Sequence, residues 1–151
     1  LNAEIQLTPI PLRIDRHNAL EILQPYDVVV DATDNFATRY LLNDACVLLG
    51  KPLVYGSVFR YEGQVAVFNF QGSANYRDLY PEPPAPGSVP DCEQGGVIGV
   101  LPGLIGCYQA NEVIKLITGT GESLRNKLML VDTLTLETNV LTIPNRNQKD
   151  S

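Results

Sequence analysis

The run of three valines at residues 28–30 constrains the fold of this chain most strongly. A continuous β-branched run predicts a strand that is covered on both faces, as in a parallel sheet. Residues 37–49 follow with helical spacing and end at Gly50, a good C-cap, and residues 52–59 are typical of the next strand. This order predicts a βαβ unit with a right-handed crossover.

Beyond this unit, the pattern predicts antiparallel strands and a second long helix. The strand over residues 64–70 returns beside residues 52–59 in a hairpin, with an apolar face of Ala66, Phe68 and Phe70 directed to the core. The other expected elements are an edge strand over 5–14, a short helix over 18–23, a helix over 97–117, and strands over 128–131 and 134–143. We therefore expect an α/β fold with a mixed sheet, parallel at its start and antiparallel afterwards, and helices packed on it.

A long irregular stretch separates the hairpin from the second long helix. Residues 71–94 hold five prolines and little periodic apolar pattern. A loop of this length inside a domain is usually functional or disordered, so we expect it to be the least ordered internal segment. Residues 1–144 then form one domain, and residues 145–151 a polar tail.

The charge balance excludes some partners. With 11 Lys and Arg against 17 Asp and Glu, the net charge is −6, which argues against nucleic acid and anionic membranes as ligands. The longest uncharged stretch, residues 94–111, is too short to span a bilayer comfortably. An odd count of three cysteines favours a reducing cytosol, so we expect a cytoplasmic protein.

The strongest candidate site is the run of Asp31, Ala32, Thr33, Asp34 and Asn35, between the valine strand and the helix that follows. Ligands of open α/β sheets lie at the carboxyl ends of strands. A carboxylate there can hold a hydrated Mg²⁺ that bridges phosphates. The alternative is structural, with Asp34 capping the helix and Asp31 merely ending the strand.

Cys92 is a second candidate, because a loop cysteine near the start of a helix can act as a nucleophile. Its neighbours Asp91 and Glu93 disfavour the thiolate, and an idle loop cysteine is the alternative. The sequence contains no phosphate-binding glycine motif of either common type. The glycines of the second long helix are expected to permit close packing against a sheet or another helix.

The chain resembles the HesA/MoeB/ThiF family, relatives of ubiquitin-activating enzymes that adenylate small sulfur-carrier proteins. The resemblance covers about residues 27–132. It rests on residues 27–36, 39–46, 51–57, 62–65, 79–84 and 89–93, and on the helix from Gly99 to Lys115.

The resemblance implies a Rossmann-like fold, ATP and Mg²⁺ as cofactors, a ubiquitin-like carrier (MoaD- or ThiS-like) as partner, and a homodimer. It assigns Asp34 to Mg²⁺ and ATP, Asn35 to the nucleotide, and Asp31 and Arg39 to the same motif. Cys92 matches a cysteine that forms a covalent acyl link in some members. The reaction joins the carrier's C-terminal glycine carboxylate to the α-phosphate of ATP and releases pyrophosphate.

Two departures from the family pattern matter. Members commonly carry a zinc ion held by two C-x-x-C pairs, but the first pair's positions here are Asn75 and Asp78, so zinc is not expected. The glycine-rich ATP loop and the basic phosphate contacts normally precede this region. The chain is therefore expected to be the C-terminal, carrier-binding part of an adenylating enzyme, inactive by itself. The alternative is a non-catalytic module that only binds the carrier.

Overall fold

A computed structural model describes residues 2–85 and 96–145 of the chain. Five strands form one sheet in the order β1-β2-β3-β4-β5. They are β1 (Val29–Asp31), β2 (Leu53–Phe59), β3 (Glu62–Phe68), β4 (Lys127–Asp132) and β5 (Thr138–Thr142). β1 pairs with β2 in parallel, and each later pair is antiparallel. The mixed sheet expected from the sequence is confirmed.

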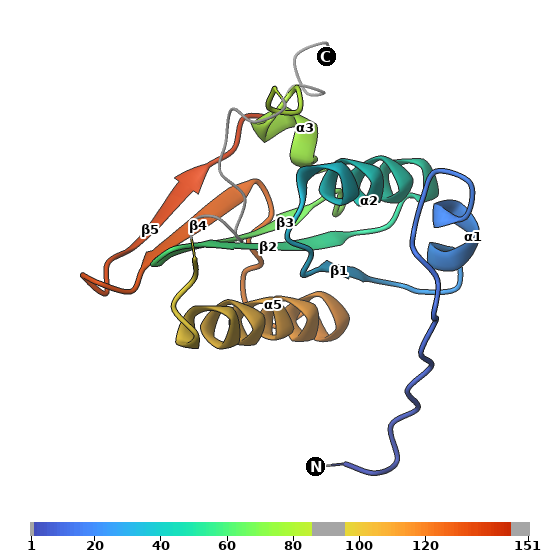
Figure 1. Ribbon diagram of the computed structural model, residues 1–151, viewed down its shortest axis with the longest axis horizontal. Helices are drawn as coiled ribbons and strands as arrows, with labels where there is room; N and C mark the ends of the chain where they lie inside the picture. The colour runs from blue at the N-terminus through green and yellow to red at the C-terminus, as the bar shows by residue number, and fades with distance from the viewer. Residues whose placement is uncertain (1, 86–95, 146–151) are drawn as a thin grey trace.

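Helices cover both faces of the sheet, as Figure 1 shows. They are α1 (Ala19–Leu23), α2 (Phe36–Leu49), α3 (Tyr76–Leu79) and α5 (Val100–Thr118). α2 and α3 lie on one face with α1 beside α2, and α5 lies on the opposite face. The strand–helix–strand unit β1-α2-β2 predicted from the valine run and the residues after it is therefore present.

The first long helix begins and ends close to its predicted bounds, whereas the second begins at Val100 and not at residue 97, which instead pairs with Arg60. The Asn35 side chain accepts a hydrogen bond from the Thr38 N–H (2.9 Å) and so caps the start of α2. α2 ends at Gly50, whose φ of 65° lies in the left-handed region that glycine adopts without cost. Pro102 lies in the first turn of α5, where its missing N–H has no helical partner.

The core consists of two apolar clusters, one on each face of the sheet. Between the sheet and α5 the buried residues are Val65, Leu101, Ile105, Met129 and Val131. The larger cluster, on the α2 side, includes Tyr55, Ala66, Phe68 and Tyr76. Ala66 and Phe68 are buried as predicted, and α5 buries the other face of β3 as well.

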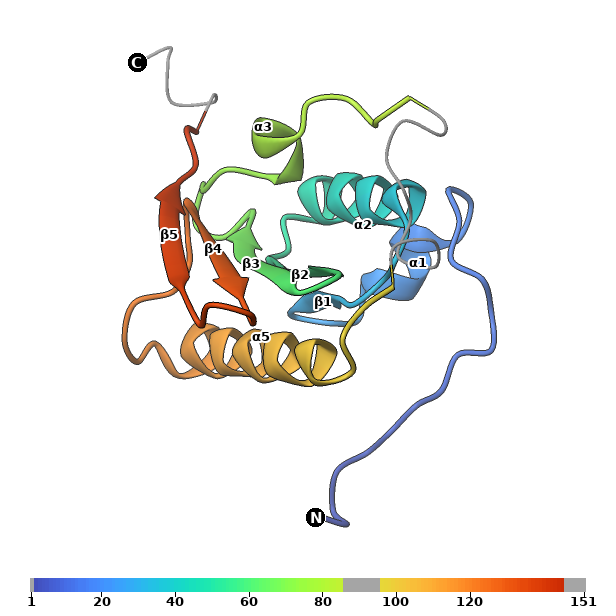
Figure 2. The same cartoon turned by 60° about the vertical axis from the view of Figure 1, so that its left-hand side comes forward.

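Several predictions about the fold are wrong. Residues 5–14 form no strand; Figures 1 and 2 show the N-terminal segment running away from the body of the molecule, with Ile5, Leu7 and Leu12 exposed. Their alternation finds no neighbouring strand, and Pro9 and Pro11 lack the N–H groups that a ladder needs. The last strand begins at Thr138, because residues 132–137 form a turn held by the Asp132 carboxylate.

Another error concerns residues 71–94, which contain the short helix α3 with its buried Tyr76. Residues 86–94 of this stretch lie outside the described residues, so the prediction that the stretch is the least ordered remains a prediction. Coverage of β1 also differs from expectation. Val30 is 46% exposed, because α5 packs against β2 and β3 and leaves that face of β1 open.

Candidate functional site

The carboxyl ends of β1 and β2 bring together most of the residues that the sequence singles out. Asp31 is the last residue of β1, and the loop of residues 32–35 leads from it into α2. Arg39 lies one turn into α2 and points back to this loop, donating from Nη2 to the Thr33 carbonyl oxygen (3.0 Å). The side chains of Asp31, Thr33 and Arg39 therefore share one end of the sheet with Asp34 and Asn35.

Asp31 is a buried carboxylate that is only half satisfied. Its Oδ1 accepts hydrogen bonds from the Thr33 N–H (2.8 Å) and the Thr33 hydroxyl (2.7 Å). Its Oδ2 has no hydrogen-bond partner among the described residues. Burial raises the pKa of Asp31, against the opposing effects of the Thr33 hydrogen bonds and the Arg39 charge. Asp31 thus fixes the loop through Thr33 and is shielded from solvent.

Arg39 is the second buried charge of the site. Its guanidinium carbon lies 5.6 Å from the centre of the Phe36 ring and 5.7 Å from that of Tyr55. Its Nε, like Asp31 Oδ2, has no partner within the described part of the chain. Buried polar groups are nearly always paired, so this buried N–H is unusual in lacking an acceptor.

Asp34 differs from both, because its side chain is exposed and engaged by none of the described residues' hydrogen bonds or ion pairs. The cap of α2 is Asn35, not Asp34. The alternative that Asp34 only caps the helix is therefore wrong, and Asn35 is the residue with the capping role. A free carboxylate at this place is a donor suited to a cation.

A small cavity of about 120 Å³ lies beside Asp34 and Arg39. The loop after β1, the end of β2 and the first half of α5 form its walls: Ala32, Thr33, Asp34, Arg39, Gly56, Ser57, Val58, Pro102, Ile105 and Gln109. A larger groove of about 330 Å³ opens on the α2 side and shares Arg39 and Ser57 with the cavity. The groove is lined by Phe36, Arg39, Tyr40, Tyr55, Ser57, Gln64, Tyr76, Tyr80, Glu82 and Pro84.

Gln109 is a residue of the site that the sequence analysis missed. It comes from α5, is 5% exposed, and donates from Nε2 to the carbonyl oxygens of Asp31 (2.7 Å) and Val54 (3.2 Å). It reaches them over Gly56, where a β-carbon would lie under 3.0 Å from the Gln109 amide. The one sequence feature that could have identified Gln109 is that it is a polar residue within an apolar stretch of the predicted helix.

Side chains of α5 therefore pack closely over two glycines of the sheet: Gln109 over Gly56, and Ile105 over Gly63. The glycines of α5 itself make no such close contact. A β-carbon at Gly99, Gly103 or Gly106 would meet no atom of the described residues within 4 Å. The expectation that the helix glycines allow close packing finds no support within this chain.

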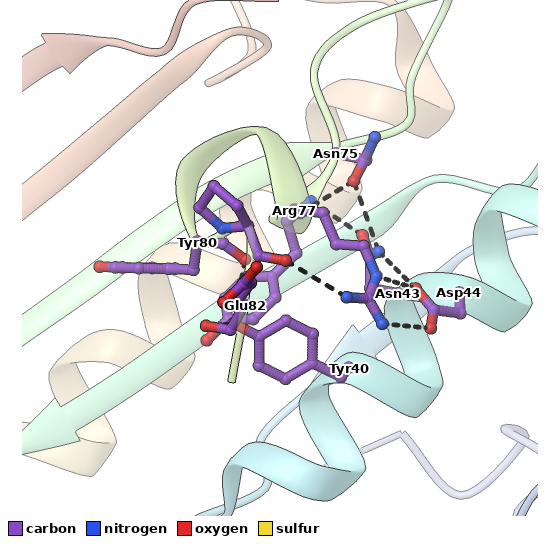
Figure 3. Close-up of polar contacts among 9 residues, drawn as sticks. Tyr40, Asn43, Asp44, Asn75, Arg77, Tyr80 and Glu82 are labelled. Carbon is purple, nitrogen blue, oxygen red and sulfur yellow. Dashed lines mark hydrogen bonds and ion pairs between the residues drawn. The ribbon is translucent and has the colours of Figure 1, made fainter. Parts of the chain in front are cut away.

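Aromatic hydroxyls organise the walls of the groove. Gln64 Oε1 accepts from the hydroxyls of Tyr55 (3.1 Å) and Tyr80 (3.2 Å). The Tyr40 hydroxyl donates toward the carbonyl oxygens of Tyr80 (2.9 Å) and Glu82 (2.8 Å), which holds residues 80–82 against α2, as Figure 3 shows. Burial raises the pKa of Tyr55 to about 12, so its hydroxyl keeps its proton at neutral pH.

The structure does not place every candidate. Cys92 lies outside the described residues. Within those residues, His, Cys, Asp and Glu form no group of three or more that could hold a metal ion. No helix among residues 2–85 and 96–145 combines the length and the apolar character that crossing a bilayer requires.

Comparison with known proteins assigns this arrangement to a family. The sequence profile of the ThiF family matches residues 1–151, the whole chain. The chain belongs to the ThiF family. Among its relatives, a sulfur carrier protein adenylyltransferase of Thermus thermophilus is 49% identical over 148 residues, which are 95% of this chain and 55% of that protein. A SAMP-activating enzyme E1 of Haloferax volcanii is 45% identical over 150 residues, 99% of this chain and 54% of that protein.

This ThiF-family chain thus spans about half the length of these relatives. Among solved structures, E. coli MccB with the peptide MccA-N7isoASN superposes with a TM-score of 0.81 at 16% identity, covering 99% of this chain and 47% of MccB. At this identity the similarity concerns the fold alone. It confirms the fold that the family resemblance implied.

Proposed function

We propose that this chain is part of an ATP-dependent adenylyltransferase that activates the C-terminal glycine of a ubiquitin-like sulfur-carrier protein. The carrier would be MoaD- or ThiS-like and serve molybdopterin or thiamine synthesis in the cytoplasm. The observation that carries the proposal is the free Asp34 carboxylate beside the buried, half-paired Arg39. Asp34 and Arg39 both line the small cavity, and Arg39 also lines the aromatic groove. Relatives named as adenylyltransferases, and an MccB structure solved with ATP, support it.

Asp34 and Asn35 would contact the nucleotide. Asp34 fits a Mg²⁺ ion because its carboxylate is exposed and unpaired, and Mg²⁺ in such sites takes one or two protein carboxylates and completes its shell with water and phosphate oxygens. When bound, Mg²⁺ neutralises charge on the phosphates. Asn35 has its Oδ1 engaged in the helix cap, so its amide NH₂ is the group left for a ligand.

Arg39 would face the reacting groups. In adenylation, a carboxylate oxygen of the carrier forms a bond to the α-phosphorus, and the bond from that phosphorus to the pyrophosphate oxygen breaks. Arg39 lines both the cavity and the groove, and a guanidinium fixed there would stabilise the negative charge of the transferring phosphate. Asp31 would not contact the substrate; it would position the loop of residues 32–35 through its two hydrogen bonds from Thr33.

The groove would take the extended C-terminal tail of the carrier. Half of its lining residues are aromatic, and Gln64 and the Tyr80 hydroxyl are among its polar groups; Arg39 also lines it. A tail without large side chains would fit a groove of about 330 Å³, and the shared Arg39 would bring the end of the tail near the cavity beside Asp34. The Cys92 thiolate would take the acyl group from the adenylate as a thioester, with AMP as the leaving group.

The outer face of α5 supports a homodimer. Val100, Leu104, Ile114 and Ile117 are exposed on this helix, and the glycines between them leave open space. An apolar helix face of this kind needs a second layer, which a second copy of the chain would provide.

Isotope exchange between ATP and pyrophosphate, measured with the protein of the complete reading frame and a sulfur carrier, tests the proposal. We expect exchange that Asp34→Ala reduces by at least about 100-fold, the usual cost of losing a group that stabilises the transition state. Asp27→Ala is the matched control, since Asp27 is also exposed and lies before the same strand. The 151-residue chain alone should show no exchange. Exchange that is unaffected by Asp34→Ala would refute the assignment, and absent exchange despite carrier binding would favour a non-catalytic module.

A further inference from the structure

The short helix α3 stands where the family resemblance places half of a zinc site. Asn75 and Asp78 occupy the positions of the first C-x-x-C pair and form a capping box. Asp78 Oδ2 accepts from the Asn75 N–H (2.8 Å) and the Asn75 Nδ2 (3.0 Å), and Asn75 Oδ1 accepts from the Arg77 N–H (2.8 Å). The two side chains therefore close the turn on each other.

The turn is also tied to α2. Asn43, which is 1% exposed, accepts from the Tyr76 N–H through Oδ1 (2.8 Å). Arg77 donates from Nε (2.8 Å) and Nη2 (2.7 Å) to the two carboxylate oxygens of Asp44, a bidentate pair visible in Figure 3. These hydrogen bonds hold the pKa of Asp44 below its ordinary value. Two neighbouring residues of α2 thus hold both the backbone and a side chain of α3.

A third tie joins the turn to the sheet. Asn126, immediately before β4, accepts from the Ala74 N–H (2.7 Å). The Tyr76 ring is buried with its centre 5.0 Å from that of Tyr40, 5.4 Å from that of Tyr55 and 5.9 Å from that of Phe68. The position of α3 is therefore fixed from three directions by hydrogen bonds and aromatic packing.

The residues present do not fit a zinc ion. Structural zinc takes four ligands, almost always thiolates or imidazoles. Position 75 offers a neutral amide, and the Asp78 carboxylate is 7% exposed and has its Oδ2 occupied by two donors. Cysteines elsewhere in a longer protein could complete at most the other half of the shell. Cys46, the buried cysteine of α2, has its pKa raised by burial to about 12, so it is no thiolate at neutral pH.

We infer that this chain holds its α3 turn with hydrogen bonds in place of a zinc ion, and that Asn75 and Asp78 are the direct substitute for the thiolate pair. The position of α3 also determines one wall of the groove, because α3 leads directly into residues 80–82, which the Tyr40 hydroxyl holds against α2. The groove wall then keeps its place without metal, and neither chelators nor thiol oxidation at this turn affects it.

Metal analysis and thermal unfolding of the 151-residue chain test the inference. After expression with added zinc and dialysis, we expect a zinc content far below one ion per chain and a melting temperature unchanged by EDTA. Asp78→Ala should lower the melting temperature by roughly 2–8 °C, the range that a lost helix cap gives in a domain of this size. Asp78→Asn, which keeps one acceptor oxygen, should lie between Asp78→Ala and the unaltered chain.

Asp27→Ala is the control, since it removes an exposed aspartate that forms none of the described hydrogen bonds. One zinc ion per chain together with a lower melting temperature in EDTA would overturn the inference, whether or not any variant folds. Equal melting temperatures for Asp78→Ala and Asp27→Ala would overturn the role of the capping box. Neither readout depends on adenylation activity.

Discussion

Replacing Gly56 by alanine should destabilise the chain by displacing Gln109. The added methyl group would lie under 3.0 Å from the amide carbon, nitrogen and oxygen of Gln109. This amide is packed between α5 and the sheet, so it cannot give way without leaving its two acceptors. The carbonyl oxygens of Asp31 and Val54 would then lose a donor held at 2.7 and 3.2 Å.

The magnitude follows from those two hydrogen bonds. A buried polar group left without its partner costs about 1–3 kcal/mol, so depriving both carbonyl oxygens of the Gln109 donor should cost about 2–6 kcal/mol. A domain of this size has a free energy of unfolding of about 5–15 kcal/mol, so the loss is a large fraction of it. Urea unfolding followed by circular dichroism measures it, and an unchanged slope shows that the difference lies in stability.

Gly103→Ala is the matched control for this prediction. Gly103 lies inside α5 with no atom of the described residues within 4 Å of a β-carbon. Alanine there should stabilise the chain by about 0.5–1 kcal/mol, because glycine is a poor helix former. The same chemical change thus has opposite signs at the two positions. If Gly56→Ala were as stable as Gly103→Ala, the packing of Gln109 over Gly56 would be refuted. Combining Gly56→Ala with Gln109→Ala should cost less than the sum of the single changes.

Three further predictions concern charge and assembly. The pKa of Asp44 is lowered, so its ion pair with Arg77 stabilises the fold fully above the ordinary pKa of 3.8, and this stabilisation is lost as the pH falls through the native pKa. Asp44→Asn should remove this part of the acid sensitivity, which is about 0.2–1 kcal/mol for an ion pair as exposed as this one. Burial raises the pKa of Asp31, so its charge destabilises the fold increasingly as the pH rises from 3.8 through the native pKa. Asp31→Asn should therefore raise the free energy of unfolding at pH 7, and a drop on urea titration would contradict this. Light scattering at tens of micromolar (roughly the range where stable interfaces persist) should show a dimer of the unaltered chain. Leu104→Glu or Ile114→Glu should convert this dimer to a monomer. If the unaltered chain is itself a monomer, the α5 interface is excluded.

Local patterns were sufficient for the main elements. The valine run, the helical spacing after it and the C-cap at Gly50 placed β1 and α2, because each depends on residues close in sequence. The edge strand over residues 5–14 was wrong because alternation alone does not supply a pairing strand. α3 was missed because its capping box occupies only four residues, too few to produce a periodic pattern.

The site was predictable only in its local part. Asp31, Asp34, Asn35 and Arg39 follow one another along the chain, so a motif places them together. Gln109 meets Asp31 across 78 residues and Val54 across 55, and no local pattern encodes such contacts. The shape of the groove likewise depends on contacts between Tyr40 and the residues near Tyr80, 40 residues apart.

Detection of the carrier adenylate tests the account most directly. The protein of the complete reading frame would be incubated with ATP, Mg²⁺ and a ubiquitin-like sulfur carrier, and the intact mass of the carrier measured. We expect the carrier to gain the mass of one AMP group, and to gain none when its terminal glycine is removed or when the enzyme carries Asp34→Ala. A carrier that binds the protein but gains no AMP group under these conditions would contradict the proposed adenylation.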